Sequence, residues 1–140
     1  MQWVTCEQVA VDRMACAWLI RRFLDPEAEF LFVAEGERSL PDGAEPFDMP
    51  GVRLSHRQGR ATFHTMLHEY ALTEDPVLGR IARLVDEADI VQEVALEPAA
   101  PGLDLICRGL RRISPDDTVA LEHGRVLYDA LYAQLASDIG

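Results

Sequence analysis

Three of the four histidines lie within a short stretch of the chain, at His56, His64 and His68. His64 and His68 are four residues apart on an expected helix, so both imidazoles can lie on one face and bind one metal ion. The motif is not the H-E-x-x-H of zinc proteases, because Glu69 follows the second histidine and projects elsewhere. The alternative for this pair is structural, with one histidine exposed and the other filling an amphipathic interface.

Carboxylates near the ends of expected elements favour the metal-binding interpretation. Asp48 precedes His56 by a few residues, and Asp89 lies at the end of an expected helix, where the helix dipole disfavours a negative charge. We expect the ligands to be His56, His64 and Asp89. Such a set without thiolates suits Zn(II), Mn(II), Fe(II) or Ni(II). Asp12 and Asp48 are second choices, because each has an expected capping role.

A thiol and several arginines add to this chemistry. Cys16 lies one turn after Asp12, so both can share a side of one helix near its positive end, either as a cap and a buried thiol or as part of an anion or metal site. No G-x-S-x-G elbow frames Cys16 as a nucleophile. Arg13, Arg21 and Arg22 can bind a small oxyanion or simply form a solvated face. The expected pocket contains Asp12, Arg13, Cys16, Asp48 and His68.

These residues depend on a helix expected over 12–24. Asp12 is the expected N-cap, Pro26 ends the helix, and an apolar face marks it as a core element. Strands are expected over 2–5 and 29–34, which makes a strand–helix–strand unit, and the apolar run in 29–34 indicates a strand buried on both faces.

Further elements complete the expected fold. A third strand over 52–56 would point His56 toward the core, and Thr62 or its neighbour would cap a helix running to about Tyr70. Asp75 and Pro76 begin a helix that ends at Asp89. Helices follow over 103–110 and, with Ser114 as the N-cap and Pro115 in the first turn, to about 136, with Gly124 a candidate break. The sequence predicts a single α/β domain over residues 1–140, or an α+β domain, with a small sheet of three or four strands and about five helices.

Composition narrows the classes of function. The formal net charge of −11 disfavours nucleic-acid binding by this chain alone. Three cysteines without a C-x-x-C pair argue against disulfides and against a thiolate zinc site. No apolar run is long enough for a membrane span, and no secretory signal is visible at the start, so we expect a cytoplasmic protein.

The chain contains the motif V-D-R-x-A-C-A-W-L-I-R-R-F-x-D-P-x-A-x-F, preceded by W-V-T and followed by P-F-D, S-H, T-F, D-P-x-L, A-D and D-A-L-Y. This order of motifs resembles the C-terminal domain of the chromate resistance family ChrB. The resemblance implies a chromate-responsive role, and longer members carry a separate N-terminal portion. The chain departs from the family pattern at Cys6, where the pattern has Arg, at His64, where it has Glu, and at Asp86, where it often has His. The last two exchanges replace one ligand type by another, which favours a metal site.

Three functions remain open at this point. The first is a metal-binding domain that senses or resists chromate or metal stress. The second is a metal-dependent enzyme, a reductase or hydrolase, that acts on a small oxyanion or another small substrate. The third is a metal-free interaction domain in which the polar residues are caps. The ligand is a metal ion or a small oxyanion, and a homodimer or a regulatory partner protein fits each function.

Overall fold

The N-terminal segment forms the expected strand–helix–strand unit. β1 (Gln2–Cys6) pairs in parallel with β2 (Glu29–Val33), and α1 (Val11–Leu19) connects them before it continues as the π-helix η1 (Ile20–Leu24). Parallel neighbours require a crossover of this kind. The two-residue strand β3 (Glu45–Pro46) pairs with the other edge of β1, so the strand order is β2-β1-β3.

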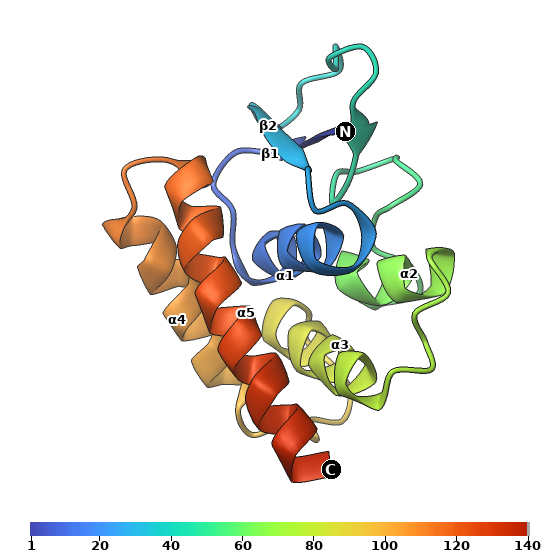
Figure 1. Cartoon of the computed structure of the whole chain (residues 1–140), viewed down its shortest axis with the longest axis vertical. Coiled ribbons are helices and arrows are strands. Elements are labelled where there is room, and N and C mark those ends of the chain that lie inside the picture. The colour runs from blue at the N-terminus through green and yellow to red at the C-terminus, as the bar shows by residue number, and fades with distance from the viewer. Residues whose placement is uncertain (140) are drawn as a thin grey trace.

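The computed structural model describes residues 1–139, and Figure 1 shows the small sheet at one end of the molecule with α1 beneath it. The remaining helices lie around α1 and away from the sheet. They are α2 (Thr62–Glu69), α3 (Pro76–Asp89), α4 (Ala100–Ile113) and α5 (Asp117–Ile139). The predicted α/β class, three strands and five helices are therefore confirmed. No helix in this part of the chain has both the length and the apolar character that a membrane crossing requires.

α1 is the central core helix, because all of its residues except Arg13 are buried. It packs against α5 at Gly124, where an added Cβ would lie 3.1 Å from the Met14 side chain. Gly124 thus lets the two helices approach closely, and α5 runs through it without a break. The prediction that Gly124 interrupts the last helix was therefore wrong.

The ends of the first helix differ from the prediction. The N-cap is Ala10, whose side chain cannot accept a hydrogen bond, and Asp12 lies inside the first turn with its carboxylate bonded to other segments. The last turn widens into η1, in which the N–H of Asp25 donates to the carbonyl of Ile20. The expected role of Asp12 as the cap of its own helix was wrong.

Two strand predictions also require correction. β2 is only half-buried, because it forms an edge of a three-stranded sheet and is not covered on both faces. Residues 52–56 do not form a strand. The backbone takes positive φ at Asp48 and Gly51, and this turn returns the chain so that Leu54 makes a single bridge with Phe47.

Of the helices in the second half, α3 begins as the sequence indicates. Asp75 caps α3 by accepting the N–H groups of Val77 and Leu78, and Pro76 occupies the first turn. α4 begins at Ala100 and is longer than predicted. Ser114 is the C-cap of α4, so the prediction that it caps the last helix was wrong, and α5 begins at Asp117 and extends to Ile139. The N-cap of α2 is Ala61, the neighbour of Thr62, as the prediction allowed. Its side chain accepts no hydrogen bond, and the hydroxyl of Thr62 donates to Asp48.

Candidate functional site

Asp12 lies at the centre of the site, buried between α1 and the N-terminus of α2. Its Oδ2 accepts the N–H of Thr62 at 2.8 Å, and its Oδ1 accepts the N–H of Phe63 at 3.0 Å. A buried carboxylate requires such partners, and the positive end of a helix supplies them. The thiol of Cys16 donates to Oδ1 at 3.5 Å from one turn further along α1.

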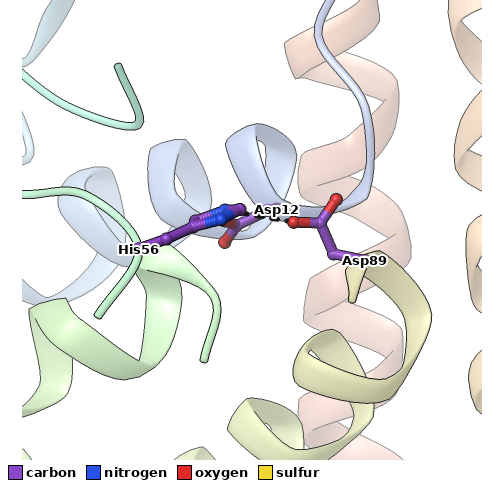
Figure 2. A group of neighbouring side chains, drawn as sticks. All are labelled: Asp12, His56 and Asp89. Atoms are coloured by element: carbon purple, nitrogen blue, oxygen red, sulfur yellow. Dashed lines mark hydrogen bonds and ion pairs between the residues drawn. The ribbon is translucent and has the colours of Figure 1, made fainter. Parts of the chain in front are cut away.

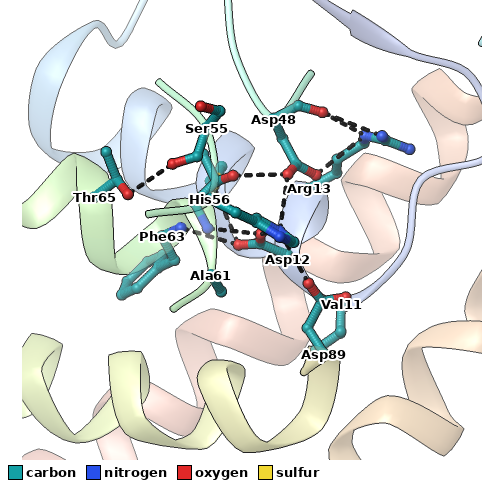
Figure 3. A network of polar contacts seen from close by, with 12 residues as sticks. Val11, Asp12, Arg13, Asp48, Ser55, His56, Ala61, Phe63, Thr65 and Asp89 are labelled. Atoms are coloured by element: carbon teal, nitrogen blue, oxygen red, sulfur yellow. Dashed lines mark hydrogen bonds and ion pairs between the residues drawn. The ribbon is translucent and has the colours of Figure 1, made fainter. Parts of the chain in front are cut away.

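His56 lies in the loop before α2, and its Nε2 faces three carboxylates (Figure 3). The oxygens are Oδ2 of Asp12 at 3.1 Å, Oδ2 of Asp89 at 3.2 Å and Oδ1 of Asp48 at 3.5 Å. The His56 side chain is 47% exposed. Because residues 52–56 form no strand, the imidazole lies at the rim of the site, and the predicted orientation toward the core was wrong.

Asp48 is held in place from two sides. Its Oδ1 accepts the hydroxyl of Thr62 at 2.7 Å, and its Oδ2 lies 3.1 Å from Nε of Arg13. Arg13 also donates to the backbone carbonyl of Asp48 at 3.1 Å. One ion pair and one backbone hydrogen bond from the same guanidinium fix the position of Asp48 beside His56.

Asp89 is the last residue of α3, at the negative end of the helix dipole. The dipole disfavours a negative charge at this position, so the carboxylate needs a compensating group. The compensating group is His56, with which Asp89 forms its one ion pair among residues 1–139.

The electrostatics follow from this crowding. The hydrogen bond to Asp12 and the charges of Asp12, Asp48 and Asp89 raise the pKa of His56 to about 9, although partial burial opposes this shift. Burial and the charge of Asp12 raise the pKa of Asp48 to about 7, against the effects of Arg13 and Thr62. Burial and Asp12 also raise the pKa of Asp89. At neutral pH the metal-free protein therefore has an imidazolium between these carboxylates.

The same atoms have the spacing of metal ligands. Asp12, His56 and Asp89 each offer one atom, and the three atoms lie within 4.8 Å of one another (Figure 2). Two ligands bound about 2.1 Å from one ion at angles of about 90–109° are separated by about 3.0–3.4 Å. The separations of 3.1 and 3.2 Å from Nε2 to the two aspartates fall in this range.

His64 and His68 lie outside this group. Nδ1 of His64 is buried 3.2 Å from Oδ2 of Asp86, at an angle that makes no hydrogen bond, and its ring stacks on His68 at 5.1 Å. The reason is the rotation of α2, which turns His64 toward α3, where Asp86 lies. The structure thus brings together two of the three expected ligands, and it pairs the two positions, 64 and 86, at which the chain departs from the family pattern.

Of the residues in the expected pocket, Arg13, Asp48 and Cys16 lie beside Asp12, but Cys16 is not a reactive group. Burial, followed by the charges of Asp12 and Asp48, raises its pKa well above the ordinary thiol value. The thiol stays protonated, which argues against both a nucleophile and a thiolate ligand at Cys16.

An open pocket adjoins His56. It has a volume of about 370 Å³ and is lined by Arg13, Asp48, Met49, Pro50, Gly51, Ser55 and His56. Its size and its mixed charges suit a small polar ligand.

Comparison with known proteins places the chain in a family. The family described as ChrB, C-terminal domain matches residues 3–135. The chain is similar to Protein ChrB of Cupriavidus metallidurans, with 37% identity over 136 residues. The match covers 97% of this chain and 41% of that protein, so the chain spans about two-fifths of the length of this relative. No solved structure matches the chain.

Proposed function

The chain belongs to the family of ChrB C-terminal domains, and we propose that it acts in chromate resistance as a metal-binding domain with Asp12, His56 and Asp89 as the ligands. One observation carries the proposal. A nitrogen and two carboxylate oxygens from three separate segments converge within 4.8 Å. The spacing from Nε2 to each oxygen suits a shared divalent ion.

The local charges support this assignment. When His56 is protonated and all three carboxylates are ionised, Asp12, Asp48 and Asp89 exceed the two positive groups, His56 and Arg13, by one charge. A divalent ion that replaces the His56 proton balances the group. Charge balance matters here, because buried charges are costly unless they are paired.

The donor types limit the identity of the ion. Imidazole and carboxylate without thiolate suit Zn(II), Mn(II), Fe(II) and Ni(II). Asp48, next to His56 and fixed by Arg13 and Thr62, supplies negative charge at the edge of the site. The oxygens of Asp12 are fixed by α2, so this ligand is preorganised.

Elemental analysis tests the proposal. Protein purified without a metal-binding tag, or reconstituted with each of the four ions, should hold about one equivalent by ICP-MS. Asp89→Asn and His56→Gln should lose it, whereas the control His64→Gln should keep it, because His64 faces Asp86. These ligand variants spare the α2 contacts of Asp12. Wild-type protein that binds none of the ions after reconstitution would refute the site.

A metal-dependent enzyme, a reductase or hydrolase acting on a small oxyanion or another small substrate, is the second candidate. The observation that favours it is the 370 Å³ pocket beside His56, with Arg13 in its wall. An ion with three protein ligands keeps positions for water or a substrate oxygen and can act as a Lewis acid. Consumption of chromate with an added electron donor, abolished in His56→Gln, would support a reductase. If the protein turns over neither chromate nor ester substrates, metal binding without catalysis is the function that stands.

A further inference from the structure

α4 has two apolar faces, and among residues 1–139 only one of them packs against other elements. The inner face packs on the core through Ala100, Leu103, Cys107 and Leu110. On the outer face Leu105, Ile106 and Ile113 are 71%, 53% and 72% exposed. A surface helix normally keeps one apolar stripe and a polar opposite side. Large aliphatic side chains gathered on a solvent face mark an interaction surface.

Two glycines extend this outer face. Gly102 and Gly109 lie seven residues apart, as do Ile106 and Ile113, so both pairs recur on one side of the helix. A Cβ at either glycine would meet nothing within 4 Å. Nothing within residues 1–139 therefore requires glycine at these helical positions, where alanine is the better helix former. A flat surface instead lets the backbone of another helix approach closely.

The charge along the edge of this face selects the occupant. α4 carries three arginines and one aspartate, whereas the chain as a whole has a net charge of −11. Arg108 pairs with Asp104 one turn earlier, and Arg112 forms no ion pair with any residue from 1 to 139. Arg111 lies on another side of the helix, where it lines a pocket with Glu7 and Glu35, so Arg112 supplies the uncompensated positive charge at the edge of the outer face.

We propose that the outer face of α4, formed by Gly102, Leu105, Ile106, Gly109 and Ile113, docks an amphipathic helix of a partner protein whose apolar stripe is flanked by acidic residues. The seven-residue spacing suits a nearly aligned helix pair, and α4 offers about 21 Å of length, or about four turns. A second copy of the chain fits less well, because its α4 would bring the same arginines to the same edge.

Binding of two designed peptides to the whole chain tests the proposal. Both are helical 18-residue peptides with leucine at the heptad a and d positions, and the flanking positions are glutamate in one and lysine in the other. By fluorescence anisotropy the glutamate peptide should bind at least about tenfold more tightly than the lysine peptide. Ile106→Ser should weaken binding of the glutamate peptide by at least about tenfold, because a buried isoleucine contact is lost. Ile139→Ser, an exposed apolar position at the end of α5, serves as the control and should not change binding.

A charge reversal separates docking from general stickiness. Arg112→Glu should shift the preference toward the lysine peptide, whereas Arg38→Glu in an exposed loop should leave it unchanged. These positions are exposed, so circular dichroism should show unchanged folding. Equal binding of both peptides, or binding of neither, would overturn the proposal. Self-association in sedimentation experiments that Ile106→Ser abolishes would also overturn it, because the occupant would then be a second copy.

Discussion

The carboxylate of Asp12 accepts the backbone N–H of Thr62 at 2.8 Å, across a separation of 50 residues. The carboxylate of Asp86, on α3, accepts the backbone N–H of Ala61 at 2.9 Å. Two buried aspartates from α1 and α3 thus cap α2, whose own N-cap residue is an alanine. Because Asp12 is also one of the three converging groups, the position of α2 and the geometry of the candidate site depend on the same side chain.

Removing this cap should destabilise the fold. In Asp12→Asn the amide NH₂ faces a backbone donor, so a buried hydrogen bond to a charged acceptor is lost, and we expect a loss of about 1–3 kcal/mol in the free energy of unfolding. Urea denaturation followed by circular dichroism, with a chelator present, measures the change. Asp42→Asn in an exposed loop is the control. An unchanged midpoint for Asp12→Asn would contradict the capping role.

Glycine substitutions should have opposite effects at two positions. Gly124→Val should destabilise the protein by about 1–3 kcal/mol, because the new side chain meets Met14, which lies 3.1 Å from the position of an added Cβ. Gly79→Ala on α3 should stabilise it by up to about 1 kcal/mol, because a Cβ there meets nothing within 4 Å and alanine favours the helix. Thermal melting of both variants provides the test, and equal shifts of the same sign would show that helix propensity alone decides.

The cysteines should resist modification in the native state. Cys6, Cys16 and Cys107 are free and buried, and burial raises the pKa of Cys107 to about 11 and that of Cys16 well above its ordinary value. Ellman's reagent should therefore label none of them until urea is added, when three thiols should react. Rapid labelling of one thiol in native protein would show that its side chain becomes accessible.

Metal affinity should depend on pH through His56. The ion requires a neutral imidazole, and the pKa of His56 is about 9 in the metal-free protein. The apparent affinity should therefore rise by about tenfold per pH unit from pH 7 and level off near pH 9. Competition with a chelator of known affinity at each pH measures this slope. An affinity independent of pH from 7 to 9 would exclude His56 as the ligand.

The stability of the metal-free protein should fall as the pH rises. The pKa of His56 is raised from 6.5 to about 9, so its stabilising charge is fully present below pH 6.5 and is lost as the pH passes 9. The raised pKa of Asp48, about 7, acts in the same direction between pH 3.8 and 7, because the folded protein retains this proton longer.

Urea unfolding in a chelator at pH 7 and at pH 9.5 tests this relation. We expect a lower unfolding midpoint at pH 9.5 than at pH 7, and a smaller difference between the two midpoints in His56→Gln. When the chelator is replaced by the metal ion, the midpoint at pH 9.5 should recover, because the bound ion takes the place of the His56 proton. Stability that rises with pH in the wild type would indicate that the imidazolium does not stabilise the carboxylates.

Local sequence signals predicted much of the fold. The Asp75–Pro76 start of α3, the crossover helix between parallel strands and the α/β class depend on capping, proline and periodicity, which act over a few residues. The sequence also marked His56 and Asp89 as expected ligands, and the structure places the two side chains 3.2 Å apart.

Other features depended on contacts that no local pattern contains. The sequence assigned Asp12 to its own helix as a cap, whereas the structure directs its carboxylate to Thr62 and Phe63. Neither residue type nor spacing predicts which donor a buried acid accepts from, because the choice depends on where another helix ends in space. The prediction that β2 is buried on both faces failed for a related reason. The number of strands beside it is a property of the whole sheet.

The histidines show the same division between sequence and structure. The sequence determined that His56, His64 and several carboxylates were available, and that thiolates were not a ligand set. Only the tertiary structure decided that His64 faces Asp86 while His56 meets Asp12, Asp48 and Asp89. The reason is physical: the rotation of α2 is fixed by the aspartates that cap its first turn from α1 and α3, and that rotation determines which side chains face one another.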